Sequence, residues 1–293
     1  MICNLCPRKC NIDRSKNIGY CKMGDVLKIS RAALHFWEEP CISGESGSGT
    51  VFFSGCNMGC VYCQNQDISH EGFGKEITTD RLSEIFIELQ EQKANNINLV
   101  TPTHFVPWIV KSIDMARDNG LKIPIVYNTS GYETKENIKL LDKKIDVYLP
   151  DFKYISGDIA KKYSFCEDYP VYAKQALDEM VKQVGPCEFD ENGIIQKGVI
   201  VRVLVLPNHE DEAKKVIEYL HSTYKDDIFI SIMSQFTPCT NLDKYPEINR
   251  KLSMEEYDRV VDFAIDIGVE NGFIQEGESA SESFIPPFNL YGV

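Results

Sequence analysis

The sequence predicts an α/β fold whose strands run parallel. From residue 50 onward, short runs of β-branched and aromatic residues alternate with segments in which apolar residues recur at helical spacing. This alternation is typical of parallel strands joined by right-handed helical crossovers, in either a βα barrel or an open α/β sheet. A chain of 293 residues is long enough to bury such a core. Six or seven strand-like runs are too few for a complete eight-stranded barrel.

Seven runs are the candidate strands. Each has a length usual for a strand and is rich in Val, Ile, Tyr or Phe. In chain order they are TVFFSG from Thr50, NINLV from Asn96, IPIVYNT from Ile123, IDVYLPD from Ile145, VIVRVLVLP from Val199, IFISIM from Ile228 and GFIQE from Gly272.

The segments between these runs predict helices. Three of them repeat apolar residues every three or four positions, so each has one face suited to packing on a sheet. Ser253 and Glu256 have the spacing of a capping box ahead of the last of these helices. The apolar stripes are Leu82, Ile85, Phe86 and Leu89; Ala173, Leu177, Met180, Val181 and Val184; and Tyr257, Val260, Val261 and Ala264.

The Gly- and Ser-rich text SGESGSG at 43–49 predicts a linker. It lacks the Lys and the spacing of a phosphate-binding loop. We therefore expect two parts in the chain. A small cysteine-rich N-terminal metal module with this linker occupies 1–49, and the βα body occupies 50–293.

Composition and charge narrow the class of protein. A chain with 43% hydrophobic and 26% charged residues has the composition of a soluble globular protein. The net charge of −13 argues against a nucleic-acid-binding surface. The text MICNLCPRKC has cysteines where a secretory signal needs an apolar region, and the most apolar run, GVIVRVLVLP, is too short to span a membrane. We expect a cytoplasmic protein without nucleic-acid or membrane partners.

Cysteines are numerous in this chain, at eleven. Seven of them form two tight groups, and in a cytosolic protein clustered cysteines are typical of metal ligands rather than disulfides. The other four are expected to be structural thiols. The two groups are Cys3, Cys6, Cys10 and Cys21, and Cys56, Cys60 and Cys63; the scattered four are Cys41, Cys166, Cys187 and Cys239.

The triplet Cys56, Cys60 and Cys63 directly follows the first candidate strand, where α/β folds place active sites. A glycine before each of the first two cysteines leaves room for the backbone to curl around a bulky inorganic centre. Thiolates select zinc or iron–sulfur clusters, and a structural zinc would need a fourth ligand such as His70. A [4Fe–4S] cluster on three thiolates leaves one iron open instead. Spacing and position favour this open cluster over zinc or a chance spacing.

The text around the triplet resembles the radical S-adenosylmethionine (SAM) enzymes. Their signature is Cys-x3-Cys-x2-Cys with an aromatic residue before the last cysteine, here Tyr62. The stretch SGCNMGCVYCQN is especially similar to the branch of the pyruvate formate-lyase activating enzymes. Nearly the whole chain resembles a subgroup of that branch labelled PflX-like, through RAALHFWEEP, NLVTPTH, VYNTSGY, YLPDFKY and IMSQFTP.

This resemblance implies a fold and a chemistry. The fold is a partial (β/α)6 TIM-like barrel, open enough to admit a large substrate. SAM binds through its amino and carboxylate groups to the open iron of the [4Fe–4S] cluster. One-electron reduction of SAM releases methionine and a 5′-deoxyadenosyl radical that abstracts hydrogen. Flavodoxin or ferredoxin is the implied reducing partner.

The resemblance also implies a class of substrate. Activating enzymes act on a protein or peptide, on which they place a glycyl radical. The same chemistry on a small metabolite is the alternative. A non-catalytic iron–sulfur electron carrier or redox sensor is a third reading, which the polar residues at the strand ends disfavour because a carrier does not need them. The radical step requires no protein base, so we assign no catalytic side chain beyond the cluster ligands.

Several residues match the family's SAM contacts. Tyr62 matches the aromatic residue near the adenine. After the second barrel strand the family usually has Gly-Gly-Glu, which meets the SAM amino group, and here TPTH stands in that place. Backbone carbonyls, with the hydroxyls of Thr101 and Thr103, would then replace the Glu. His104 and Tyr127 are expected to line the core.

Three further strands end in or carry polar residues that match SAM contacts. Asn128 and Ser130 match the position where polar groups meet the ribose or carboxylate. Asp151 and Lys153 match an Asp-x-Lys motif in which the Lys pairs with the SAM carboxylate, although two such residues can also form a surface ion pair. Arg202 is a second candidate for that carboxylate, and its alternative role is to neutralise a buried carboxylate.

The N-terminal set, Cys-x2-Cys-x3-Cys-x10-Cys from Cys3 to Cys21, has four thiolates and predicts a closed metal site. CNLC and GYCK resemble zinc knuckles, which favours structural zinc. A second [4Fe–4S] cluster is the alternative, since a Pro beside a Cys also occurs in ferredoxin-type runs. Related activases with extra clusters use two such cysteine sets, and this chain has one. The nearby Arg8, Lys9 and Arg14 are expected to form a solvated face.

Overall fold

One mixed sheet confirms the predicted α/β fold. In the computed structural model, which describes residues 2–238, 241–275 and 285–293, ten strands form a sheet in the order β10-β9-β8-β6-β5-β4-β2-β1-β3, with β7 paired to β8. The strands from β2 to β10 in this order are parallel neighbours and coincide with the seven predicted runs. The strands are β1 (Leu27–His35), β2 (Ser48–Phe53), β3 (Lys75–Ile77), β4 (Ile97–Val100), β5 (Ile125–Thr129), β6 (Val147–Pro150), β7 (Glu188–Phe189), β8 (Ile195–Leu204), β9 (Phe229–Met233) and β10 (Gly272–Ile274).

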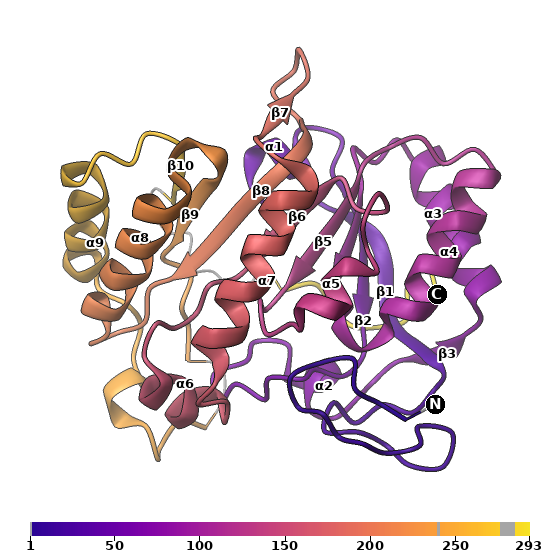
Figure 1. Ribbon diagram of the computed structural model, residues 1–293, viewed down its shortest axis with the longest axis horizontal. Coiled ribbons are helices and arrows are strands. Elements are labelled where there is room, and N and C mark those ends of the chain that lie inside the picture. Colours follow the sequence, from indigo (N-terminus) through magenta and orange to yellow (C-terminus); the bar gives the residue numbers. More distant parts are fainter. Residues whose placement is uncertain (1, 239–240, 276–284) are drawn as a thin grey trace.

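Helices connect the parallel strands. The pair α3 and α4 flanks one end of the sheet and the pair α8 and α9 the other, with α5 and α7 between them (Figure 1). No helix within the described residues is long and apolar enough to cross a membrane. The helices are α1 (Pro40–Ser43), α2 (Gln66–Ser69), α3 (Thr79–Glu91), α4 (Val106–Asp118), α5 (Lys135–Lys139), α6 (Gly157–Ser164), α7 (Tyr169–Val184), α8 (Glu210–Tyr224) and α9 (Met254–Asp266), with 3-10 turns at Thr103–Phe105, Lys225–Asp227 and Pro246–Ile248.

The three predicted helices form, with their apolar stripes turned toward the sheet. They are α3, α7 and α9, and the stripe residues are buried apart from half-buried Val181 and Val261. The predicted capping box is also confirmed. Ser253 Oγ accepts from the backbone N–H of Glu256 over 3.2 Å, and the Glu256 carboxylate accepts from the backbone N–H of Ser253 over 3.1 Å. A cap of this kind contributes about 1 kcal/mol to the stability of a helix.

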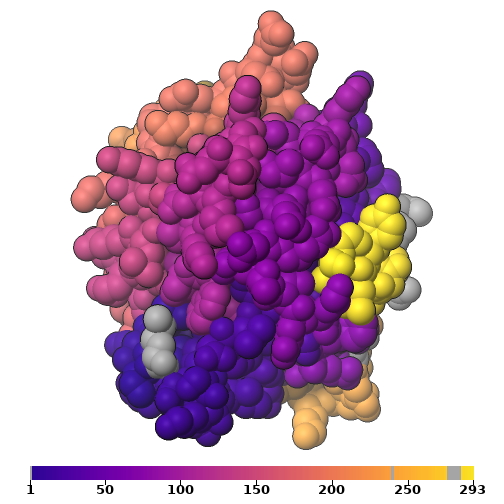
Figure 2. Space-filling view, turned by 90° about the vertical axis from the view of Figure 1, so that its right-hand side faces the viewer, coloured from indigo at the N-terminus to yellow at the C-terminus, as the bar shows by residue number. Residues whose placement is uncertain are grey.

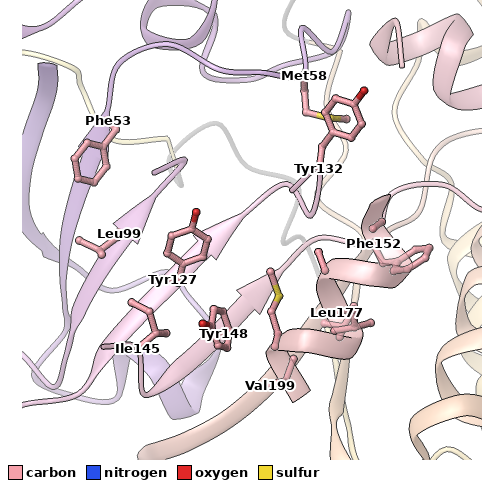
Figure 3. Packing of buried hydrophobic residues seen from close by; sticks show 14 of the residues in the cluster. Phe53, Met58, Leu99, Tyr127, Tyr132, Ile145, Tyr148, Phe152, Leu177 and Val199 are labelled. Atoms are coloured by element: carbon pink, nitrogen blue, oxygen red, sulfur yellow. The ribbon is translucent and has the colours of Figure 1, made fainter. Parts of the chain in front are cut away.

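The core lies between the sheet and the helices. The strands β4, β5 and β6 are buried along their whole length, because helices and loops cover both faces of a parallel sheet. Tyr127 on β5 is in register with Tyr148 on β6, and their rings pack edge to face with centroids 5.9 Å apart. Leu177 of α7 packs in the same core (Figure 3). Truncating a buried leucine to alanine typically destabilises a protein by about 2–5 kcal/mol.

The strand β1 was not among the predicted runs. It is antiparallel to β2 from Ile29, opposite Phe53, to His35, opposite Ser48, and it also pairs with β3. The segment 43–49 therefore joins two hydrogen-bonded strands, and its residues Ser48 and Gly49 already belong to β2. The domain boundary at residue 49 stays a prediction, and the structure pairs strands across it.

The C-terminal segment of the described chain packs against β1. Figure 2 shows the N-terminal residues as one region at the bottom of the surface and the C-terminal segment packed higher on the same side. That segment is fixed to β1 by backbone hydrogen bonds from Leu290 N–H to Ser30 over 3.0 Å and from Ala32 N–H to Tyr291 over 2.9 Å.

Candidate active site

A cavity of about 540 Å³ opens at the carboxyl ends of the parallel strands. The three cysteines of the triplet line it, together with residues at or just after the ends of β4, β5, β6, β9 and β10. The carboxyl edge of a parallel sheet is where α/β folds place their active sites. Of the residues predicted to contact SAM, all but Thr103 line this cavity; they are Tyr62, Thr101, Asn128, Ser130, Asp151, Lys153 and Arg202.

Polar hydrogens point at the sulfurs of the triplet. Ser164 Oγ donates to Cys60 Sγ over 3.0 Å, and the backbone N–H of Met58 donates to Cys56 Sγ over 3.4 Å. Cys63 Sγ and Ser69 Oγ are 3.2 Å apart. Burial raises the pKa of Cys56 to about 12 and also raises the pKa of Cys60, so these thiols stay protonated until a metal displaces the proton.

The donor set suits an iron–sulfur cluster better than a single ion. Within residues 2–238, 241–275 and 285–293, no three His, Cys, Asp or Glu side chains are placed to hold one metal ion, and zinc with His70 stays the alternative prediction. A zinc ion would draw its ligand sulfurs to about 2.3 Å from itself. A [4Fe–4S] cube bonds each cysteine to a different iron and therefore holds the thiols further apart. Three soft donors at the wall of a cavity fit that larger group.

The glycines of the cysteine loop also make room for another segment of the chain. Gly55 and Gly59 adopt φ values of +83° and +80°, which favour glycine. A Cβ on Gly55 would lie 2.4 Å from the carbonyl oxygen of Cys21, and one on Gly59 would lie 2.8 Å from the hydroxyl of Tyr20. The space that these glycines leave is filled by the N-terminal segment, so that segment packs directly against the loop.

Asp151 and Lys153 form an ion pair inside the cavity, with Nζ 2.6 Å from Oδ2. Burial alone would lower the pKa of Lys153, but the Asp151 carboxylate and the nearby Cys60 sulfur raise it above the ordinary value, so the ammonium stays charged. The hydroxyl of Tyr169 accepts from the backbone N–H of Lys153 over 2.9 Å and reaches the Ser130 carbonyl over 2.9 Å. Tyr169 thereby ties the ends of β5 and β6 together, a role that the sequence did not reveal.

Ser130, just after the end of β5, has a side-chain hydroxyl whose hydrogen-bonding capacity is unused within the described residues. Its Oγ is buried and has no hydrogen-bond partner within the described residues, although the residue lines the cavity. Asn128, also at the end of β5, is 9% exposed and lines the same wall. An unsatisfied buried hydroxyl is unfavourable by about 1–3 kcal/mol, and a polar ligand in the cavity would relieve that penalty.

Thr101 and Thr103 point to different places. Thr101 lines the cavity and has φ +59°, an unusual conformation for a β-branched residue that is found mostly at functional sites. Thr103 is buried and donates to Glu133 Oε1 over 2.6 Å instead. Glu133 also accepts from the hydroxyls of Tyr127 and Thr129, over 2.9 and 2.8 Å. Burial raises the pKa of Glu133 despite these donors. As expected, Tyr127 belongs to the core.

Arg202 is bound to two carboxylates. Its Nε donates to Glu39 Oε1 over 2.8 Å and its Nη2 to Glu39 Oε2 over 2.6 Å, and Nη2 also pairs with Glu38. Burial would raise the pKa of Glu39, but the guanidinium holds it below the ordinary value. This arrangement matches the alternative role for Arg202, and its role as a SAM contact stays a prediction.

Tyr62 begins a chain of hydroxyls that ends at the cysteine triplet. Its OH lies 2.5 Å from the OH of Tyr154, which lies 2.8 Å from Ser164 Oγ, the donor to Cys60. The Tyr62 ring packs edge to face on Phe236, with centroids 5.9 Å apart. These two contacts position the ring in the cavity wall, where we predict that the adenine of SAM lies.

Cysteines of the N-terminal set lie close together, but their sulfurs are not arranged to bind one metal ion in this structure. Cys10 and Cys21 are neighbours, because a Cβ on Gly19 would lie 3.6 and 3.5 Å from their sulfurs. Burial raises the pKa of Cys6 to about 12. No three thiols of this set are placed to hold one ion, as noted above for the described residues. Zinc or a second cluster here stays a prediction. Among the scattered cysteines, Cys41, Cys166 and Cys187 are free thiols, and Cys239 lies outside the described residues.

The prediction that three nearby basic residues form a solvated face is wrong for two of them. Arg14 is only 2% exposed and donates to the carbonyl of His104 over 2.5 Å. Arg8 is half-buried against the cysteine loop. Lys9 alone is exposed. The guanidinium groups of Arg8 and Arg14 donate to backbone carbonyls of loops far along the chain. No local sequence pattern predicts such partners.

Comparisons with known proteins show the family of this chain. The family model described as Radical SAM superfamily matches residues 50–220. The uncharacterized protein MJ0674 of Methanocaldococcus jannaschii is 31% identical over 271 residues, covering 89% of this chain and 74% of that protein.

Two solved structures share the fold. SuiB of Streptococcus suis, bound to its precursor peptide SuiA, has a TM-score of 0.52 at 11% identity, covering 76% of this chain and 47% of SuiB. HydG, a maturase of the [FeFe]-hydrogenase, has a TM-score of 0.53 at 18% identity, covering 78% of this chain and 52% of HydG. The chain spans about half the length of these two proteins. The family match and the fold lead to one conclusion: the chain belongs to the radical SAM superfamily, whose members use an iron–sulfur cluster to cleave SAM reductively and start radical chemistry.

Proposed function

We propose that this radical SAM enzyme abstracts hydrogen from a protein or peptide, as activating enzymes do. The observation that carries the proposal is one cavity that joins the thiol triplet and the strand-end polar residues to an apolar mouth. Phe36, Trp37 and Ile274 line this cavity and are still 51%, 58% and 53% exposed. Large apolar side chains exposed together are typical of interaction sites. A mouth of this kind suits a polypeptide segment.

The chain's own residues would bind and orient the reactants. Cys56, Cys60 and Cys63 would hold the [4Fe–4S] cluster, which when bound supplies one electron for the cleavage of SAM. Lys153, held by Asp151, would pair with the SAM carboxylate as a charge-assisted contact. The aromatic wall would exclude water from the reacting atoms.

The remaining strand-end residues complete the proposed SAM site. The open hydrogen-bonding capacity of Ser130 would be used by a polar group of SAM, and Asn128 beside it would meet the ribose or carboxylate. The strained backbone at Thr101 would present its carbonyl to the amino group. Tyr62 would lie along the adenine.

The observation that favours a small metabolite is the ion cluster inside the cavity. Arg202 with Glu38 and Glu39 is a charged group in the lining of the cavity, beside the apolar residues of its mouth. Charged side chains of this kind can bind a small charged substrate by direct pairing. Against the metabolite, SuiB, a solved structure of the same fold, was crystallised with a precursor peptide, which supports the proposed peptide substrate by analogy alone.

The two substrate classes can be separated by isotope transfer. The reconstituted enzyme is incubated with dithionite, SAM and extracts of the encoding organism grown in deuterated medium, divided into a protein fraction and a small-molecule fraction. Deuterium in 5′-deoxyadenosine from the protein fraction alone supports the proposal. Transfer from the small-molecule fraction alone contradicts it and selects the metabolite. A Trp37→Ala variant should weaken transfer from the protein fraction while unproductive SAM cleavage continues.

A further inference from the structure

The guanidinium of Arg8 is bonded to the backbone of the cysteine loop. Its Nε donates to the carbonyl of Asn57 over 2.8 Å, and its Nη2 donates to the carbonyl of Met58 over 2.8 Å. Both carbonyls lie between Cys56 and Cys60, in a turn where the backbone makes no regular ladder. Backbone carbonyls in such a turn need partners from elsewhere, and Arg8 supplies them from a segment 49 residues away.

The same guanidinium also holds the segment that hydrogen-bonds a cysteine sulfur. Arg8 donates to the carbonyl of Ser164 over 3.1 Å and to the carbonyl of Phe165 over 2.6 Å. The side chain of Ser164 donates to Cys60 Sγ over 3.0 Å. One planar group therefore sets the distance between the cysteine loop and the donor to its central sulfur. A guanidinium can do this because its donors lie in one rigid plane.

Two aromatic rings fix the guanidinium in place. Its carbon lies 3.9 Å from the centre of the Tyr20 ring and 5.3 Å from that of Tyr132. The backbone carbonyl of Tyr132 in turn accepts from the side chain of Asn57 over 2.7 Å. A cation stacked on aromatic rings is attracted by their faces, so both contacts oppose movement of the half-buried Arg8 side chain into solvent.

The backbone of Arg8 belongs to the other cysteine set. Arg8 lies in the turn between Cys6 and Cys10, which is closed by a hydrogen bond from Lys9 N–H to the Cys6 carbonyl over 3.0 Å. The backbone of Arg8 thus lies in a turn of the N-terminal set, and its side chain contacts the triplet loop.

We propose that Arg8 is a positioning residue for the cluster, because its guanidinium fixes the triplet loop relative to Ser164, the donor to Cys60 Sγ. The inference rests on the proposed function, because it takes Cys56, Cys60 and Cys63 as the cluster ligands. Hydrogen bonds to the cysteine sulfurs help to set the reduction potential of an iron–sulfur cluster. Moving Ser164 relative to Cys60 changes such a bond directly.

The test compares Arg8→Lys with a matched control, Arg117→Lys. Arg117 also donates to two backbone carbonyls, those of Leu121 and Ile123, but it does so at the far end of α4. Each protein is reconstituted with iron and sulfide. The readouts are the EPR spectrum of the reduced cluster with and without SAM, its midpoint potential, and the rate at which a chelator removes its iron. Lysine keeps the charge of Arg8 but cannot reproduce the planar fork.

Arg8→Lys should change the EPR spectrum and the midpoint potential and should speed the loss of iron by about tenfold, the scale of one charge-assisted hydrogen bond. Arg117→Lys should leave all three readouts at the wild-type values. An Arg8→Lys protein with wild-type spectrum, potential and iron release overturns the inference. If Cys60→Ala keeps its full iron content, the proposed ligand set has failed instead.

A second variant covers the case in which Arg8→Lys folds poorly. Arg8→Ala opens a space beside an exposed surface depression lined by Tyr132, Phe165 and Asp168. Ethylguanidinium added at a non-denaturing concentration should restore the wild-type EPR spectrum of this variant, whereas ethylammonium should not. Restoration by neither compound, or equally by both, contradicts a specific role for the guanidinium.

Discussion

The hydroxyl of Ser164 donates a hydrogen bond of 3.0 Å to the sulfur of Cys60, across 104 residues of sequence. Ser164 ends α6, so the helix carries this donor to the middle cysteine of the triplet. The same oxygen is 2.8 Å from the hydroxyl of Tyr154. The sulfur that we assign to the cluster is therefore hydrogen-bonded from a fixed element rather than from a mobile loop.

Ser164→Ala should make the cluster harder to reduce. A hydrogen bond to a cysteine sulfur stabilises the more negative, reduced cluster, and one neutral bond contributes about 1 kcal/mol, or ~40 mV for one electron. We expect the midpoint potential to become more negative by that order, with iron content unchanged. Ser222→Ala, on the exposed face of α8, is the control. An unaltered potential in Ser164→Ala would show that this bond does not reach the cluster.

Lys153→Ala should weaken the binding of SAM without loss of the cluster. A charge-assisted contact to a carboxylate is worth about 1.5–3 kcal/mol, or roughly 10- to 150-fold in dissociation constant. Equilibrium binding of SAM to the reconstituted protein measures it. Lys161→Ala is the matched control, because Lys161 pairs with Glu167 on the surface. An unchanged dissociation constant for Lys153→Ala would remove this residue from the proposed SAM site.

His104 should make the fold sensitive to acid. Burial lowers the pKa of His104 from 6.5 to about 4, where its ring contacts the Ser54 carbonyl over 2.7 Å. Because the folded-state pKa is depressed, the unfolded chain binds a proton first as pH falls. The stability that comes from keeping this ring neutral is full above pH 6.5 and is lost between pH 6.5 and 4.

The free energy of unfolding that is lost through His104 over this pH range is about 1–3 kcal/mol. Urea unfolding of the metal-free protein and of a His104→Gln variant at several pH values measures this loss. The free energy of unfolding of the variant should fall less over the same pH range. Parallel pH profiles for the two proteins would rule out His104 as the source of the acid sensitivity.

Metal analysis should distinguish the two assignments of the N-terminal cysteines. With zinc there, the protein should contain about one zinc and about four irons per chain, and the iron should fall to zero in a variant with all three triplet cysteines replaced. A second cluster would instead give about eight irons, of which about four survive in that variant. Zinc cannot pass electrons, so this result also decides whether the N-terminal set takes part in redox chemistry.

Much of the fold could be predicted from the sequence. The parallel strands are buried on both faces, so their β-branched runs stand out against the amphipathic helices, and all seven runs became strands. The strand β1, from Leu27 to His35, lacks this contrast. Four of its nine residues are only half-buried, and a bulge interrupts its pairing near Ile29. It was therefore missed.

The candidate site was predictable to the extent that it follows from topology. Parallel strands end at one edge, so Asn128, Asp151 and the cysteine triplet had to meet there. Side-chain direction did not follow from position. Thr103 turned to the buried Glu133, and Arg202 found partners more than 160 residues away. Long-range polar partners leave no periodic signal in the sequence.

The most direct test of the central claim is the formation of 5′-deoxyadenosine from SAM and dithionite under anaerobic conditions, measured for the reconstituted wild-type protein and for Cys60→Ala. The account predicts a product that increases with time in the wild type and is absent in the variant. Cys41→Ala, which removes a buried thiol outside the triplet, should keep the activity. Equal product from wild type and Cys60→Ala, or none from a wild-type protein that carries its iron, would contradict the assignment of this site.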